Sequence, residues 1–599
     1  MNFKSSIVIL GLVSKIYAAT FSVVSFDGAC QLNAGGQLYE MTQSKQGIPL
    51  YTVEASVQTG STYNYVCGGK EDVQRTLTDN SSHNELVGRS KTIIDMPEFG
   101  FPNAKPWNRS IGRTELFDPD YVPIIIISPD QKFFTGASRS TTFGSMTFIL
   151  KDNVFTFNNV PASGKNYDED KFQFRVTLPN GGIYNRDVLK FRPSSYDPVF
   201  FRQMLYGDIA HAIGNPAHES VAARVYLSDG TAIGLYVLQE DCTTESFIRT
   251  AFYGNPETQQ VTNYQKSIIY DCGTGADFNP QDPFQLGSFM PDDTTDQKIE
   301  LQEMINKVAE LNIMDDNAVK NLDENWLELD TLYRALALEY LAGHWDSYWF
   351  MTTNFVVFHP AEETEGEKYS HTKYKYYFID QDFDQTWGSN MKATLDAGNY
   401  PNKPYYEYVN QSSEFWKALN ADEGELEPGT RILLNKFLGC DGQQSCSTKT
   451  YFENHLKDIV QHIFNPVAMK MKTDGYKERL SEEVQWDTTI SRLHVNPNSI
   501  YHFTYDDFVN GIDGPTGMFP YGILDWTEKI CNTVCNQFGI TYDKTPYTPE
   551  TAAQVKPQSI EAGTKYDDSA NLQKSGSVMN KANTAMIVLA ALISYVILL

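Results

Sequence analysis

Three carboxylates stand at alternate positions in the stretch "YYFIDQDFDQTWG" (376–388), namely Asp380, Asp382 and Asp384. They directly follow the run "KYKYYFI", whose aromatic and β-branched residues are typical of a strand. If the extended conformation continues, the three side chains lie on one side, where they repel one another unless a cation or hydrogen-bond donors neutralise them. The spacing therefore indicates either a divalent-cation site or a turn in which the aspartates accept bonds from backbone amides.

A calcium loop of the EF-hand type does not fit this stretch. Such a loop needs glycine at its sixth position and glutamate at its twelfth, where this chain has Gln385 and Met391. The chain also contains neither the GxSxG motif of serine hydrolases nor the HExxH motif of zinc proteases. A glycosidase, which could use any two acids, remains open.

Phosphoryl transfer is the chemistry that uses the largest number of these residues. It needs acids that hold Mg²⁺ against nucleotide phosphates, an acid that orients the attacking hydroxyl, and a cation from a β-rich region. The stretch "HWDSYWFMTTNFVVF" supplies Asp346 and Asn354, and Asp382 comes after the next strand, in the order used by protein kinases. Two features differ from ordinary kinases: seven residues rather than four separate Asp346 from Asn354, and no glycine-rich loop is visible.

The elements that must position these residues change in character along the chain. Residues 20–92 alternate apolar and polar side chains between glycine and asparagine turns, which predicts a small β-sandwich. Further strands are expected up to about residue 240, whereas residues 298–345 have helical periodicity. The last predicted helix ends at Gly343, so that Asp346 falls in the loop beyond it. We therefore expect an α+β fold with two lobes after the N-terminal module.

Both ends of the chain have the composition of targeting segments. Residues 1–19 combine Lys4, a short apolar run and small residues, as in a secretory signal peptide. The apolar run 585–599 has no basic residue after it and lies downstream of small residues at Ser575 and Gly576. This pattern predicts a glycosylphosphatidylinositol attachment signal, the alternative being an ordinary C-terminal membrane helix.

Cysteines and glycosylation sequons agree with secretion. Disulfides are favoured over zinc because no pair of CxxC motifs exists and the histidines are not grouped with the cysteines. Spacing favours Cys440 with Cys446 and Cys531 with Cys535, and Cys30 with Cys67 and Cys242 with Cys272 would close longer loops, although connectivity stays open. Sequons occur at Asn80, Asn108 and Asn410.

The net charge of −27 over 599 residues excludes broad electrostatic binding to nucleic acid, which requires a basic surface. It suits a glycosylated ectodomain held off a membrane surface.

The segments "YLAGHWDSYW" and "YYFIDQDFDQTWG" resemble the CotH family, named for spore-coat protein H, and in particular its surface-anchored members in mucoralean fungi. The segments "DKFQFRV" and "YLSDGTAIGLYVLQED" add to this resemblance, which extends from the N-terminal module to the stalk. It implies an atypical protein-kinase-like fold, and bacterial members phosphorylate serines of other coat proteins. By motif, Asp346 resembles the catalytic-loop acid, Asn354 and Asp382 the metal ligands, and Lys171 the strand lysine that meets the phosphates.

The same resemblance implies a rival function, because some fungal members act as invasins that bind a host-cell receptor. Their epitope begins with a MGQT-like string after a "WDGYW" motif, and that string is missing here. Adhesion through another surface, or a structural role in the spore wall, remains an alternative.

These patterns together predict a lipid-anchored cell-surface or spore-wall protein that uses Mg²⁺ (or Mn²⁺), held by Asp382 with Asn354 or Asp384, and ATP. The expected partners are a protein substrate or a host-cell receptor, with no nucleic acid. The expected segments are a signal peptide (1–19), an N-terminal β-sandwich (20–92), a kinase-like domain (93–545), a Pro/Ser/Thr stalk (546–575) and the attachment signal (576–599).

Overall fold

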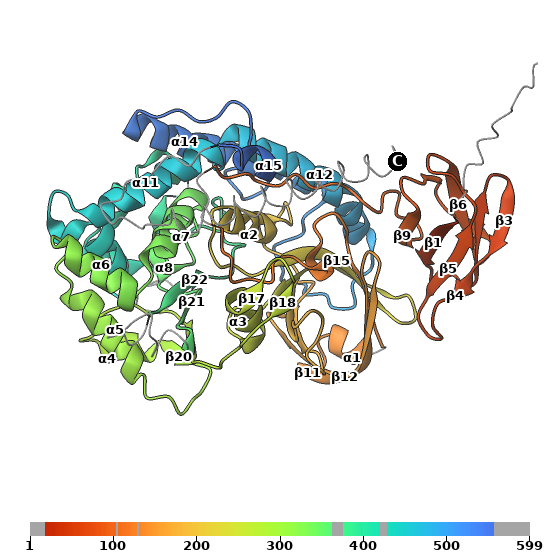
Figure 1. Ribbon diagram of the computed structural model, residues 1–599, viewed down its shortest axis with the longest axis horizontal. Helices are drawn as coiled ribbons and strands as arrows, with labels where there is room; N and C mark the ends of the chain where they lie inside the picture. The colour runs from red at the N-terminus through yellow and green to blue at the C-terminus, as the bar shows by residue number, and fades with distance from the viewer. Residues whose placement is uncertain are drawn as a thin grey trace, which may run out of the picture.

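The computed structural model describes residues 18–102, 106–128, 131–361, 375–396, 398–419 and 428–555. It is a mixed α/β protein in which a group of N-terminal strands lies at one end, beside a barrel and a larger helical part (Figure 1). Nearly all of the expected signal peptide and the expected attachment residues Ser575 and Gly576 lie outside the described residues. No helix in the described ranges is long and apolar enough to cross a bilayer.

The N-terminal strands form two small sheets that share one hydrophobic cluster, which includes Phe21, Leu32 and Tyr65. The first sheet has the order β4-β5-β1-β9, and the second contains β3-β2-β6-β7 with β8 paired to β6. The strands are β1 (Ala19–Val24), β2 (Cys30–Ala34), β3 (Gln37–Glu40), β4 (Thr42–Gln43), β5 (Leu50–Ala55), β6 (Thr62–Cys67), β7 (Lys70–Glu71), β8 (Arg75–Thr76) and β9 (Ser81–Leu86). Strand β1 begins at Ala19, the last residue of the expected signal peptide.

The middle of the chain forms a closed barrel with the strand order β10-β11-β12-β13-β14-β16-β15. Aromatic and aliphatic side chains fill it, including Phe133, Phe174 and Phe191. The strands are β10 (Ile124–Ile127), β11 (Ser140–Ile149), β12 (Val154–Lys165), β13 (Gln173–Thr177), β14 (Val188–Arg192), β15 (Ser220–Leu227) and β16 (Ala232–Glu240). Helix α2 (Arg202–Ala212) connects β14 to β15 and packs with the helical part in the largest core cluster.

The helical part encloses a four-stranded sheet with the order β20-β19-β21-β22. Its strands are β19 (Ile269–Cys272), β20 (Phe289–Pro291), β21 (Phe355–Phe358) and β22 (Tyr377–Asp380). The main helices are α5 (Ile299–Glu310), α6 (Asp316–Asn325), α7 (Leu329–Ala342), α8 (Tyr348–Met351), α11 (Ser447–His462), α12 (Pro466–Thr489), α13 (Tyr505–Asp513) and α14 (Ile523–Phe538). The long helix α12 also contacts β16, so it joins the helical part to the barrel (Figure 1).

Helix α7 ends at Gly343, as the sequence predicts, and thereby releases the segment that carries Asp346. Gly343 has φ +59°, and a Cβ built on it would lie 2.4 Å from Cζ2 of the buried Trp526. We expect Gly343→Ala to lower the free energy of unfolding by about 2–4 kcal/mol, because it adds overpacking to an unfavourable backbone conformation. Urea denaturation measures this loss.

The matched control is Gly539→Ala, at the end of α14. Gly539 also has positive φ (+63°), but its added Cβ would meet nothing within 4 Å. This variant should lose only about 1 kcal/mol, from the backbone conformation alone. Equal losses in the two variants would mean that the contact with Trp526 has no energetic weight.

Two of the expected disulfides form, Cys30–Cys67 and Cys440–Cys446. The expected Cys242–Cys272 bond is wrong, because the two buried thiols belong to different core clusters and Cys242 Sγ lies 3.3 Å from Nδ1 of His218. The expected Cys531–Cys535 bond is also absent: both thiols lie on α14, one turn apart, with their sulfurs 4.0 Å from each other.

The expected stalk begins as part of the folded body. The carbonyl of Tyr547 accepts a hydrogen bond from the amide of Gly100 (2.9 Å), and the short helix α15 (Pro549–Ala552) buries Ala552. The three sequon asparagines, Asn80, Asn108 and Asn410, are all solvent-exposed.

Candidate active site

The hairpin of β21 and β22 places Asn354 and Asp382 at the same end of the sheet. The strands are antiparallel, with Phe355 opposite Asp380, and the amide of Gln381 donates to the carbonyl of Asn354 (3.0 Å). Residues that precede β21 therefore lie beside residues that follow β22.

Asp346 reaches this end of the sheet from the loop after α7. The Nδ2 of Asn354 donates to the backbone carbonyl of Asp346 (2.6 Å) and to its Oδ2 (3.0 Å). The two residues that the sequence assigns to one catalytic loop thus contact each other directly, despite the long spacing between them.

The backbone at this position is unusual, because Asn354 and Asp382 both adopt positive φ (53° and 58°). Non-glycine residues seldom take this conformation, and those that do often lie at functional sites. The conformation of Asp382 also ends the alternation of the strand: Asp380 is the last residue of β22, and its Oδ2 accepts from the hydroxyl of Tyr206 on α2 (2.8 Å). Since the extended conformation does not continue past Asp380, this aspartate does not share one side with Asp382 and Asp384.

Cations from the barrel act on these acids, and the sequence did not single out either Arg192 or Lys190, the two on β14. Arg192, on β14, ion-pairs with Oδ1 of Asp382 through Nη1, and its Nη2 lies 2.7 Å from Oδ2 of Asp384. Lys190, two residues earlier on the same strand, pairs with Asp241 (3.1 Å) and also acts electrostatically on Asp382. The available signal was the segment "LKFR", in which two cations stand at alternate positions of a strand that precedes a helix.

Burial and neighbouring charges together lower the pKa of Asp382 and raise the pKa values of Asp346 and Asp384. Burial alone would raise the pKa of Asp382, but Arg192 and then Lys190 outweigh it and hold that pKa well below its ordinary value. The pKa of Asp346 rises to about 7, because of burial first and then repulsion from Asp382 and Asp384. Burial also raises the pKa of Asp384, although Arg192 opposes the shift. The site thus combines an ionised acid with one that titrates near neutral pH, a pattern found at catalytic sites.

Asp380 belongs to a separate buried acid pair below these residues. Burial raises its pKa to about 6, and burial followed by repulsion from Asp380 raises the pKa of Glu339 on α7 well above its ordinary value. The Oε2 of Glu339 accepts a hydrogen bond from the amide of Trp349 (3.1 Å). Glu339 therefore binds the segment after α7 through Trp349, and Asp380 binds α2 through Tyr206.

Phe383, between the two site aspartates, packs against α2 and against the segment that precedes β15. Its ring stacks on Tyr206 of α2 (4.3 Å between centroids) and on the buried His218 (4.6 Å). The Nε2 of His344 lies 3.0 Å from the carbonyl oxygen of Asp382, which ties the loop after α7 to the loop after β22.

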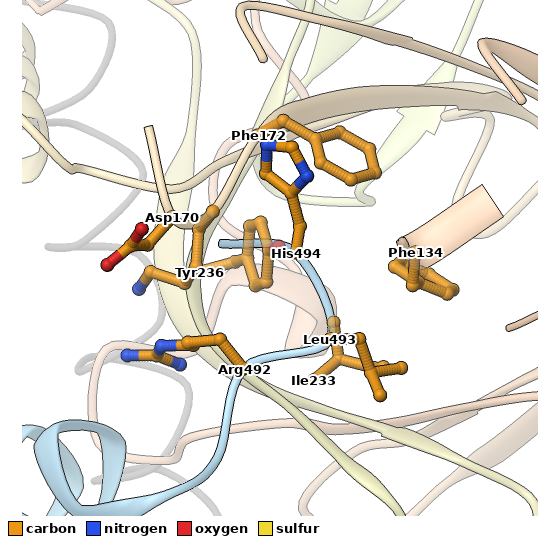
Figure 2. A pocket seen from close by; sticks show the side chains of 9 residues that line it. Phe134, Asp170, Phe172, Ile233, Tyr236, Arg492, Leu493 and His494 are labelled. Carbon is orange, nitrogen blue, oxygen red and sulfur yellow. The ribbon is translucent and has the colours of Figure 1, made fainter. Parts of the chain in front are cut away.

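Lys171, the lysine that the family resemblance assigns to phosphate, forms a different set of contacts. Its Nζ pairs with Asp487 on α12 (2.9 Å) and donates to the carbonyl of Leu235 (2.7 Å). Figure 2 shows the small pocket that Lys171 lines together with Tyr236, Arg492 and other side chains. The structure therefore brings together Asp346, Asn354, Asp382 and Asp384, with Lys190 and Arg192 as the neighbouring cations, and ties Lys171 to α12.

Mg²⁺ prefers carboxylate and carbonyl oxygens as ligands. Asp382, Asp384 and the amide oxygen of Asn354 are such donors, so they fit the ion chemically. In the described part of the chain, however, no group of three or more acids, histidines or cysteines is close enough to chelate a metal, and Arg192 bonds one oxygen of each carboxylate.

Comparisons with known proteins give the family of this chain. A family model described as "CotH kinase protein" matches residues 163–504. "Invasin CotH3" of Rhizopus delemar is 26% identical over 571 residues, which cover 90% of this chain and 88% of that protein. "Invasin CotH7" of the same organism is 28% identical (85% of this chain and 81% of that protein), and its "Spore coat protein homolog 1" is 27% identical (87% and 82%).

Proposed function

The chain belongs to the CotH kinase protein family, and from this membership we propose that it is a Mg²⁺-dependent kinase that transfers phosphate from ATP to protein serine residues. The relatives named as invasins and as a spore coat protein homolog support a location at the cell surface or in the spore coat. The proposed architecture is an N-terminal β-sandwich followed by a two-lobed, atypical kinase-like domain. A lipid anchor attached at Ser575 or Gly576 would hold it at the membrane.

The observation that carries the proposal is the meeting of two acidic loops from the helical part with two cations from the barrel. Asp346 and Asn354 come from one loop and Asp382 and Asp384 from the other, while Lys190 and Arg192 come from β14. Acids that hold a metal, an acid that orients a hydroxyl and cations that meet phosphates are the parts that phosphoryl transfer requires.

Asp346 is the proposed base for the serine hydroxyl. Asn354 fixes its carboxylate through a bond of 3.0 Å, and a pKa of about 7 lets the carboxylate accept a proton near neutral pH. Lys190 and Arg192 are proposed to meet the β and γ phosphates of ATP, Arg192 by exchanging a carboxylate for a phosphate oxygen. Mg²⁺, when bound by Asp382 with Asn354 or Asp384, supplies further neutralisation of phosphate charge.

Labelled ATP provides the direct test. The purified chain, incubated with γ-labelled ATP, Mg²⁺ or Mn²⁺ and casein as a general acceptor, should place label on serine. Asp346→Ala should reduce incorporation by roughly 10²–10³-fold, because the hydroxyl loses its base. Absence of transfer by the parent chain with either metal, to itself or to casein, would count against the kinase proposal.

Adhesion to a host cell is the second candidate, because two of the named relatives are described as invasins. It requires no chemistry at Asp346, so an adhesin predicts that the parent and Asp346→Ala bind host cells equally. A purely structural wall component predicts neither transfer nor cell binding.

A further inference from the structure

Lys165, the last residue of β12, carries a positive charge close to the candidate active site. It lies opposite Gln173 on β13, and Arg175, two residues further along β13, lies opposite Lys190 on β14. Residues directly opposite each other project to the same side of a sheet, as do residues two apart on one strand. Lys165 therefore projects to the same side as Lys190 and Arg192.

This side is the outer face of the barrel. Phe174 and Phe191, which alternate with these residues along β13 and β14, belong to the hydrophobic cluster inside the barrel. On the outer face, Arg192 is paired with Asp382 of the candidate site. Lys165 thus lies on the surface of the barrel that meets the site acids.

Lys165 differs from its neighbours on this face in having no partner of its own. Arg175, Lys190 and Arg192 are each paired with a carboxylate. Lys165 is solvent-exposed and forms neither an ion pair nor a side-chain hydrogen bond within the part of the chain that the structure describes. Enough protein surrounds its ammonium that desolvation lowers its pKa, an effect that the charge of Asp382 opposes.

The ammonium of Lys165 and the carboxylate of Asp382 act on each other electrostatically without direct contact. Each shifts the pKa of the other, yet no ion pair joins them. An anion that binds Arg192 must first replace a carboxylate, whereas an anion that binds Lys165 replaces only water. Lys165 therefore offers an incoming anion a charge that no acid of the protein has already claimed.

We propose that Lys165 binds the phosphate chain of a nucleoside triphosphate beyond its first phosphate. The inference rests on the proposed kinase function, in which the β and γ phosphates lie beside Asp382. A lysine ammonium suits such a ligand, because it is a compact charge with three donors on a flexible stem. Lys171, to which the family resemblance gives this role, is held by Asp487 on α12.

Isothermal titration of the purified chain with ATP and with AMP, each with Mg²⁺, tests the proposal without any need for phosphate transfer. Lys165→Met should raise the dissociation constant of ATP by roughly 10–100-fold, because one charge-assisted hydrogen bond is lost. The affinity for AMP should stay the same, since AMP lacks the phosphates concerned. Lys165→Arg should retain most of the affinity for ATP. The control is Lys45→Met, an exposed lysine of the N-terminal strands, which should bind ATP like the parent.

Lysine acylation in the parent provides a measurement that does not depend on the folding of a variant. With Mg²⁺ present, ATP but not AMP should slow the reaction of Lys165 with an N-hydroxysuccinimide ester, while Lys45 reacts at an unchanged rate in both cases. Mass spectrometry of the peptides measures both rates.

The possible failures can be told apart. Equal ATP affinity of Lys165→Met and the parent, or an equal loss of ATP and AMP affinity in this variant, would overturn the role of Lys165 and leave the kinase proposal to the labelling test. Failure of the parent to bind ATP would overturn both.

Discussion

Phosphate transfer is expected to fall by about 10³-fold or more when Asp382 is replaced by alanine. Asp382 is the only acid of the site whose pKa is held well below its ordinary value, so it stays ionised under all working conditions. In the proposed mechanism Asp382 would hold the metal that neutralises phosphate charge, and losses of this size follow when one such group is removed from a phosphoryl-transfer site. Incorporation of label from ATP measures the effect.

Two controls separate a catalytic loss from a structural one. Asp293→Ala, an aspartate of the exposed surface, should transfer phosphate like the parent. Asp382→Ala leaves Arg192 paired with Asp384, so near-ultraviolet circular dichroism should show a retained fold. If folded Asp382→Ala transferred phosphate as the parent does, the assignment of this loop to catalysis would be wrong.

Asp346→Asn is expected to stabilise the protein while it abolishes transfer. Folding raises the pKa of this carboxyl from 3.8 to about 7, so ionising it in the folded state costs free energy that the unfolded chain does not lose. That cost is zero below about pH 4, grows as the pH rises toward 7 and is complete above it. Since Asp346 is partly exposed, we expect a gain of on the order of 2 kcal/mol at pH 8.

Denaturant unfolding of Asp346→Asn and the parent from pH 4 to pH 8 measures this difference. Asp487→Asn provides a control of opposite sign, because Lys171 and Arg492 outweigh burial and hold the pKa of Asp487 well below its ordinary value. Asp487 contributes stability that is present above pH 4 and is lost as the pH falls through its lowered pKa. Asp487→Asn should therefore be less stable than the parent at neutral pH. A stability gap between Asp346→Asn and the parent that does not change with pH would contradict the assigned pKa of Asp346.

Local sequence patterns were sufficient to predict several secondary-structure elements of this protein. Periodicity predicted the N-terminal strands and the end of α7 at Gly343, because apolar spacing and a glycine C-cap act within a few residues. The kinase-like order of Asp346, Asn354 and Asp382 along the chain predicted that these residues contribute to one site. The structure places these residues together, since antiparallel pairing of β21 and β22 brings the two loop ends to one edge.

Which groups face these acids could not be read from the chain, because each contact joins segments far apart in sequence. Arg192 pairs with Asp382 across 190 positions of the sequence, and Lys171 pairs with Asp487 on α12 across 316. Whether a barrel cation contacts the site acids or α12 therefore depends on how the barrel packs against the helical part. The same holds for the separation of Cys242 from Cys272 into different core clusters. Packing between distant segments sets the charge and burial around each group, and no local spacing encodes that packing.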